Sequence, residues 1–197
     1  MFFCGIFAIV MEEVKSFLSQ KGNYKDLIVY QKSECIYDIT FYFVNKYLPK
    51  GDRTVDQMVQ AARSGKQNIA EGAAAGTTSS ETELKLINVA KASLQELKID
   101  YEDYLRVRGL PQWKLGEEKF EQTRRVCSSH SDSAYYREAV QSRSDEVIAN
   151  LAIIMINQTD YLLKHLFDKL KRDFLEHGGI KEEMSRARME YRRRHGN

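Results

Sequence analysis

The chain has 197 residues, of which 2 are proline and 29% are charged, with a formal net charge of +2. This near-neutral balance does not argue for nucleic-acid binding through bulk charge, so a basic surface has to come from local clustering. The scarcity of proline favours helices, because proline interrupts helix interiors. A chain of this length buries roughly 70% of its unfolded surface, enough for one domain with a hydrophobic core.

The first ten residues (MFFCGIFAIV) are apolar, but they are too short to span a bilayer. They also lack the basic start and the small-residue cleavage site of a signal peptide. Two interpretations stay open: Met11 is the true start, or the segment is a membrane-associating leader. We treat residues 1–23 as an N-terminal leader and expect no membrane partner.

The three cysteines are odd in number and widely spaced, and no C-x-x-C pair occurs. They are Cys4, Cys35 and Cys127. This usage predicts reduced thiols in a reducing compartment, and therefore a cytoplasmic protein. Cys35 falls in an apolar helical pattern and is predicted to lie in the core.

Apolar residues recur at three- and four-residue steps through most of the chain, which predicts amphipathic helices. The first helix covers 24–48. The second begins at a capping box made by Thr54 and Gln57 and runs to about Glu71. The third spans 81–107.

The turn between the second and third helices is rich in small residues. Gly72 is predicted to take the left-handed conformation that ends a helix. Ser80 and Glu83 form an S-x-x-E capping box for the helix that follows.

After the third helix, residues 110–131 form a mixed insertion that docks a short irregular helix. Asp132 or Ser133 then caps the longest helix, which is predicted to continue to 177 and to end at the glycine pair that follows. The tail, 178–197, is basic and compatible with a helix. The predicted fold is all-α: an antiparallel up-down four-helix bundle over 24–177 with a C-terminal helical extension.

Signals for bound cofactors are missing. A metal centre in a helix bundle needs Glu-x-x-His pairs, and no such pair occurs. The chain also has neither of the glycine-rich phosphate-loop patterns. We therefore expect no metal and no cofactor.

Two loose Arg-x(4–6)-His spacings are typical of helical ribonucleases that work as dimers. They join Arg124 to His130 and Arg172 to His177. In such a site a histidine acts as general acid or base while an arginine steadies the phosphate. Because the spacing is permissive and the chain has 30 Lys and Arg residues, matches by chance are expected.

Cations gather at the C-terminal end, where ten Lys or Arg residues between 164 and 197 face six Asp or Glu residues. A phosphate backbone requires such density without precise spacing, so this cluster favours a contact with RNA or DNA. A solubilising helix tail is the other interpretation. The candidate contact residues are Lys169, Lys171, Arg172, Arg186, Arg188, Arg192, Arg193 and Arg194.

Three blocks of the chain, in order and at matching spacing, resemble a known family. Residues 24–32 (YKDLIVYQK) are similar to its YKDLxVWQK opening, and residues 57–72 (QMVQAARSGKQNIAEG) to its QLRRAAxSIxxNIAEG block. Residues 83–97 (ELKLINVAKASLQEL) are similar to its EFxRFLxIARGSLxEL block. The family is that of four-helix-bundle proteins encoded in 23S ribosomal RNA intervening sequences. The longer C-terminal region looks like the variant with an additional suffix.

The resemblance implies a small bundle that self-assembles. The same superfamily includes the accessory variability determinant of diversity-generating retroelements, a homopentameric barrel of such bundles that binds nucleic acid and a reverse transcriptase. The resemblance therefore implies that this chain forms a homo-oligomer, for example a pentamer, with RNA, DNA or a reverse transcriptase as partner. Val59 and Gln60 stand where the family block has two arginines, which removes part of its basic face.

Several family-matched positions are predicted to be structural. Asn68 lies near a helix end and is expected to bond to backbone in the turn. Arg63, Glu71 and Glu96 are expected to form a polar cluster between helices, since 63 and 71 share a helix face. The positions in this structural motif are Arg63, Asn68, Glu71, Gly72, Ser93 and Glu96.

The sequence thus favours a non-enzymatic, oligomeric accessory protein that holds nucleic acid through basic helix ends gathered by self-assembly. Two alternatives stay open. One is a protein-interaction module, for instance a reverse-transcriptase accessory without direct nucleic-acid binding. The other is the dimeric ribonuclease described above.

Overall fold

The computed structural model describes residues 23–196, and this part of the chain is helical, with no strand. Its elements in chain order are η1 (Tyr24–Asp26), α2 (Ile28–Tyr47), α3 (Arg53–Ala75), α4 (Ser80–Val107), α5 (Glu118–Ser129), α6 (Ser133–Ala139), α7 (Asp145–His177) and α8 (Ile180–His195). The predicted all-α class is confirmed. The predicted leader and Cys4 lie outside the described residues, apart from Asn23.

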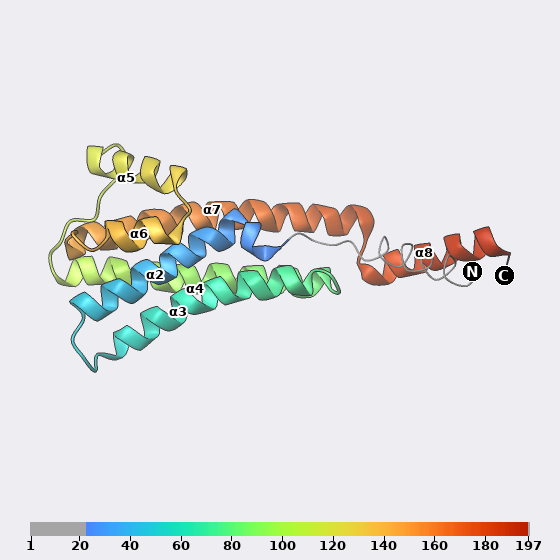
Figure 1. Ribbon diagram of the computed structural model, residues 1–197, viewed down its shortest axis with the longest axis horizontal. Helices are drawn as coiled ribbons and strands as arrows, with labels where there is room; N and C mark the ends of the chain where they lie inside the picture. The colour runs from blue at the N-terminus through green and yellow to red at the C-terminus, as the bar shows by residue number, and fades with distance from the viewer. Residues whose placement is uncertain (1–22, 197) are drawn as a thin grey trace, which may run out of the picture.

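The four long helices α2, α3, α4 and α7 lie side by side and enclose the core (Figure 1). Both α2 and α4 pack on α3 and on α7. The connections at 48–52 and 76–79 are short, so each of these helices packs against the next one in the chain. The shorter helices lie outside this group, α6 against α2 and α5 against α7.

An aromatic cluster joins α2 to α4 in the core. The Phe43 ring lies 5.0 Å from that of Tyr101 and 4.7 Å from that of Tyr104. The Tyr101 hydroxyl donates to Thr40 Oγ1 at 3.0 Å, and Thr40 in turn donates to the Ile36 carbonyl at 2.7 Å. Each aromatic pair contributes about 0.5–1.5 kcal/mol beyond area burial. The Tyr101 and Thr40 hydroxyls are thus both hydrogen-bonded although they are buried.

The two helices α3 and α4 approach closely at Gly65. A Cβ at this position would lie 2.7 Å from Leu94 Cδ2, so only glycine fits there without movement. Beside this contact, the Ser64 and Ser93 hydroxyls hydrogen-bond at 3.0 Å between the helices. Asn68 Nδ2 donates to the Ser64 carbonyl at 2.8 Å and to its Oγ at 3.1 Å.

This arrangement corrects the predicted polar motif. Asn68 bonds within its own helix, not to the following turn, and it meets Ser93 through Ser64. Arg63, Glu71 and Glu96 are each exposed, and no ion pair joins them within residues 23–196. The inter-helix polar contact is neutral because the helices touch through small residues, which keep long charged side chains on the outer face.

The prediction for Gly72 was wrong. Gly72 is a helical residue of α3, which continues to Ala75, and its φ is not among the positive ones. It is buried, and a Cβ there would lie 3.4 Å from Leu86 Cβ and 3.5 Å from the Glu83 carbonyl oxygen. A small residue at this point lets α4 begin against the end of α3.

Two predicted capping boxes are displaced. The N-cap of α3 is Asp52, whose carboxylate accepts from the Thr54 amide at 2.9 Å. The N-cap of α4 is Ser79, whose hydroxyl accepts from the Thr82 amide at 3.2 Å. In both cases a residue just upstream of the predicted cap performs the capping, so the helix starts earlier than the box implied.

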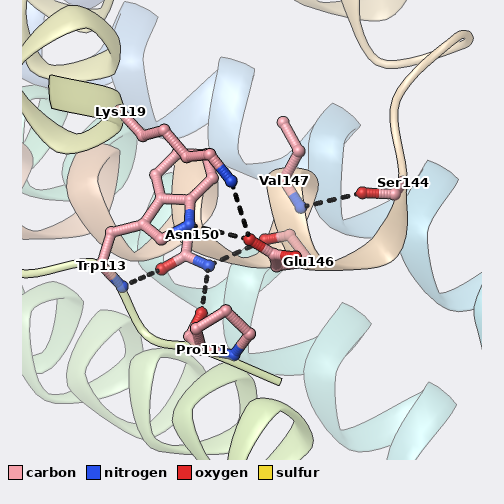
Figure 2. Close-up of polar contacts among 7 residues, drawn as sticks. All are labelled: Pro111, Trp113, Lys119, Ser144, Glu146, Val147 and Asn150. Atoms are coloured by element: carbon pink, nitrogen blue, oxygen red, sulfur yellow. Dashed lines mark hydrogen bonds and ion pairs between the residues drawn. The ribbon is translucent and has the colours of Figure 1, made fainter.

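The predicted longest helix is two helices. Asp132 caps α6 as expected, but α6 ends at Ala139, and Ser144 caps α7 (Figure 2). The carbonyls exposed at the break are satisfied by α2. The Gln141 carbonyl accepts from Tyr42 at 3.1 Å, and the Arg143 carbonyl accepts from Tyr47 at 2.6 Å.

The insertion is anchored to α7 by Asn150, which is 2% exposed. Its Oδ1 accepts from the Trp113 amide at 2.8 Å, and its Nδ2 donates to the Pro111 carbonyl at 3.0 Å (Figure 2). Glu146 accepts from the Trp113 indole at 2.9 Å and lies 3.6 Å from Lys119 Nζ. The segment before α5 is therefore fixed to α7, and the predicted short irregular helix is the regular, 12-residue α5.

Candidate nucleic-acid interface

The predicted basic surface lies on the C-terminal part of α7 and on α8. Figure 1 shows α8 beyond the end of the four long helices, away from the connection between α2 and α3. None of the residues of α8 is buried. The eight predicted contact residues, from Lys169 to Arg194, are all exposed.

The junction between α7 and α8 has a defined geometry. Gly178 takes a φ of 76°, a left-handed value that favours glycine, and it ends α7 as predicted. The Glu182 carboxylate accepts from the Gly179 amide at 2.9 Å and so caps the start of α8. Arg186 donates to the His177 carbonyl at the end of α7. Arg186 thus stabilises the junction itself.

Most of the other candidate cations are free. Arg194 pairs with Glu190 at 2.5 Å within α8. The remaining six have no ion pair or hydrogen bond from their side chains within the described chain: Lys169, Lys171, Arg172, Arg188, Arg192 and Arg193. Arg188 and Arg192 are one helical turn apart and therefore share one side of α8. Free, exposed cations at this density can bind phosphates without breaking existing pairs.

The residues of the two Arg-x(4–6)-His spacings have other contacts. Arg124 pairs with Glu121 at 3.0 Å, and the His130 ring stacks on Tyr135 at 4.1 Å. His177 Nδ1 lies 3.2 Å from the Asp173 carbonyl oxygen of its own helix. Among the described residues, neither histidine contacts the arginine of its spacing.

Residues 23–196 contain no group of three or more His, Cys, Asp or Glu side chains arranged to hold a metal ion. Within the same residues, no helix is both long and apolar enough to cross a membrane.

A groove between α2 and α6 was not predicted. It is lined by aromatic residues of α2, including Tyr37 and the 53%-exposed Phe41, and by Arg137 of α6. Asp38 accepts from the Ser133 hydroxyl at its edge. The available signal was Phe41 itself, an aromatic residue outside the inner stripe of its helix.

Buried Lys32 also escaped the sequence analysis. Its ammonium donates to the carbonyls of Cys127 and His130 at the C-terminal end of α5, where the helix dipole is negative. Burial lowers the pKa of Lys32 and raises that of the Cys35 thiol to about 12 and of the Cys127 thiol to about 11. Burial therefore favours the protonated form of both thiols, and Lys32 holds α5 onto α2.

No family model matches the chain, and no curated protein or solved structure matches it. The resemblance to the intervening-sequence proteins therefore stays a prediction.

Proposed function

We propose that this protein is a non-enzymatic, cytoplasmic accessory protein of RNA or DNA, acting through the cationic surface of α7 and α8. Its four long helices would form an antiparallel up-down four-helix bundle that assembles with copies of itself. Assembly brings several weak phosphate-binding surfaces together and raises their joint avidity. From the family resemblance, we expect the assembly to be a homopentamer and one partner to be a reverse transcriptase.

One observation carries the proposal: the predicted contact residues are exposed, and the side chains of six of them form no ion pair within residues 23–196. The 16-residue α8 is about 24 Å long. A DNA duplex presents roughly 14 backbone charges over that length, more than the cations of α8. The number of contacts is therefore determined by the free arginines of α8 and not by the number of phosphates on the duplex.

The test is fluorescence anisotropy of the full chain with a labelled RNA and a labelled duplex DNA of mixed sequence. The variant Arg192→Glu/Arg193→Glu reverses two free cations on α8. We expect it to weaken binding about tenfold or more, since each lost phosphate contact removes favourable counterion release. The control Lys50→Glu/Arg53→Glu makes the same charge change at two exposed positions, in the connection between α2 and α3 and at the first residue of α3. This connection lies at the end of the long helices away from α8 (Figure 1).

Equal losses in the two variants would show that net charge, and not α8, governs binding. Absence of binding by the wild-type chain at low salt would end the proposal. Cleavage of the labelled RNA that His130→Ala or His177→Ala abolishes would replace it with the ribonuclease.

The groove between α2 and α6 favours a second candidate function, that of a protein-interaction module. Phe41 is exposed beside Tyr37, whose ring lies 4.4 Å from Lys66 Nζ. Binding of a protein partner that is insensitive to salt and lost in Phe41→Ser would support it. Binding that persists in this variant would remove the groove from consideration.

A further inference from the structure

An apolar stripe runs along α8, and no residue of this helix is buried. It consists of Ile180, Met184, Ala187 and Tyr191, spaced four, three and four residues apart. This is the spacing of the a and d positions of a coiled coil, with Met184 and Tyr191 at a and the other two at d. Met184 is 52% exposed and Tyr191 is 57% exposed.

The residues that flank this stripe are sorted by charge. The g positions on one side are Glu183 and Glu190, both acidic. The e positions on the other side are the cationic Lys181 and Arg188, followed by His195. The g and e positions determine which helices pair and in which orientation.

The sorted charges favour one orientation. In a parallel pair, a g residue faces the e residue five positions further along the other helix. Glu183 would then face Arg188 of the second copy, and Glu190 would face its His195. In an antiparallel pair g faces g and e faces e, which brings the two glutamates together and Lys181 beside Arg188.

The structure also presents α8 as a preformed helix. Glu182 and Arg186 fix its start relative to the end of α7, and no residue of α8 is buried. An isolated helix of this length is marginally stable in water, so a helical partner would add to its stability.

We propose that α8 pairs in parallel with α8 of a second copy of this chain, through the stripe from Ile180 to Tyr191. The free Arg192 and Arg193 lie at the b and c positions, on the outer side of such a pair, and stay exposed. Pairing thus brings Arg192 and Arg193 of two copies together and leaves them accessible, whereas Arg188 faces Glu183 and Arg194 lies at the seam. The inference rests on the stripe and its flanking charges and holds whether or not the partner is nucleic acid.

The test is a charge exchange read by sedimentation equilibrium of the full chain. Glu183→Lys/Glu190→Lys makes both flanks basic, and Lys181→Glu/Arg188→Glu makes both flanks acidic. We expect each variant alone to fall to half the wild-type mass, toward the 22.9 kDa of one chain where α8 is the sole contact. An equal mixture of the two is expected to regain the wild-type mass, with one copy of each, which misfolded chains would not do.

The matched control is Arg192→Glu/Arg193→Glu, which carries the same charge change as the acidic variant but lies on the outer side of α8. It is expected to keep the wild-type mass. A wild-type chain of 22.9 kDa at every concentration, unchanged mass in both flank variants, or no recovery on mixing would overturn the proposal.

Orientation is read by cross-linking Arg194→Cys in a Cys4→Ser background, because the other two cysteines are buried. A parallel pair puts position 194 of both copies at one d layer, within disulfide reach. In an antiparallel pair the two thiols would be more than roughly 20 Å apart. Rapid disulfide formation is therefore expected, and its absence from a paired chain contradicts the parallel arrangement.

The nucleic-acid proposal can fail separately. The Glu183→Lys/Glu190→Lys chain keeps every cation of α8, so nucleic-acid binding by the single chain persists if that proposal is correct. If pairing of α8 is lost and nucleic-acid binding is retained, the nucleic-acid proposal stands without pairing. If pairing is retained and no nucleic acid binds, the pairing proposal stands alone.

Discussion

Replacing Gly65 with alanine tests how closely α3 approaches α4. The added methyl would lie 2.7 Å from Leu94 Cδ2 and 2.9 Å from its Cγ, and Leu94 is fully buried. Inserting a methyl group into a well-packed core costs about 1–3 kcal/mol. Alanine in place of glycine inside a helix returns about 1 kcal/mol. The difference is a net loss of about 0–2 kcal/mol in the free energy of unfolding, and because Leu94 is fully buried we expect the upper half of that range, about 1–2 kcal/mol.

The matched control is Gly72→Ala, one further glycine on the same helix. Its added methyl would meet Leu86 Cβ at 3.4 Å and Ile87 Cδ1 at 3.6 Å, which are ordinary contacts. The helix-propensity gain then dominates, and stability should rise by about 0.5–1 kcal/mol. A left-handed Gly72, as the sequence suggested, would instead make alanine destabilising by roughly 1–2 kcal/mol.

Urea unfolding followed by circular dichroism measures both changes, and thermal unfolding provides a second reading. For a chain of 197 residues, about 2–4 °C in Tm corresponds to each kcal/mol. We expect Gly65→Ala to melt about 2–8 °C below the wild type and Gly72→Ala to melt above it. A Gly65→Ala chain as stable as Gly72→Ala would refute the close approach of the two helices.

Three further substitutions test individual contacts. Asn150→Ala leaves the Trp113 amide and the Pro111 carbonyl without their partner. We expect the free energy of unfolding to fall by about 2–4 kcal/mol and amide exchange in 110–117 to become faster. A loss below about 1 kcal/mol would contradict the anchoring role. Tyr101→Phe removes the hydrogen bond to Thr40, which keeps its own bond to Ile36, so urea unfolding should show a loss of about 1 kcal/mol, and an unchanged midpoint would count against the bond. Burial lowers the pKa of Lys32 in the folded chain below its ordinary 10.5, so between the folded-state pKa and 10.5 the unfolded chain binds more protons. The stability of the wild type relative to Lys32→Met should therefore rise with pH in that window. A difference in stability that is independent of pH would contradict the burial of the ammonium.

The long helices could be predicted because their inner faces repeat regularly. Leu94, Leu97 and Tyr101 on α4 are all fully buried, as the three- and four-residue steps indicated. Helix starts were less predictable, since Ser79 and Ser80 are both able to cap a helix. The register was fixed at Ser79, and the sequence pattern alone does not distinguish the two.

The break between α6 and α7 has a nonlocal cause. No glycine or proline marks residues 140–144, which is why the sequence pattern joined the two helices. The exposed carbonyls of Gln141 and Arg143 are satisfied by Tyr42 and Tyr47, about a hundred positions away in the chain. Only the tertiary structure brings these partners together.

The candidate site divides in the same way. The cations of α8 were predictable as exposed, since Lys and Arg side chains are almost never fully buried without a partner. The junction contact of Arg186 with His177 depends on a turn that the sequence did not specify. Buried Lys32 was not predictable either, because its partners are the carbonyls at the end of a helix distant in sequence.

The most direct test of the proposed function is the salt dependence of binding to mixed-sequence RNA, measured for the wild type and for Arg192→Glu/Arg193→Glu. Log K should fall linearly with log salt, with a slope of about 0.7 for each phosphate contact on a single strand and about 0.9 on duplex DNA. With four contacts on single-stranded RNA, affinity would fall roughly 50-fold between about 50 and 200 mM salt. The variant should show a shallower slope by about one contact for each arginine that binds phosphate. A slope near zero, or the same slope in both chains, would contradict the account.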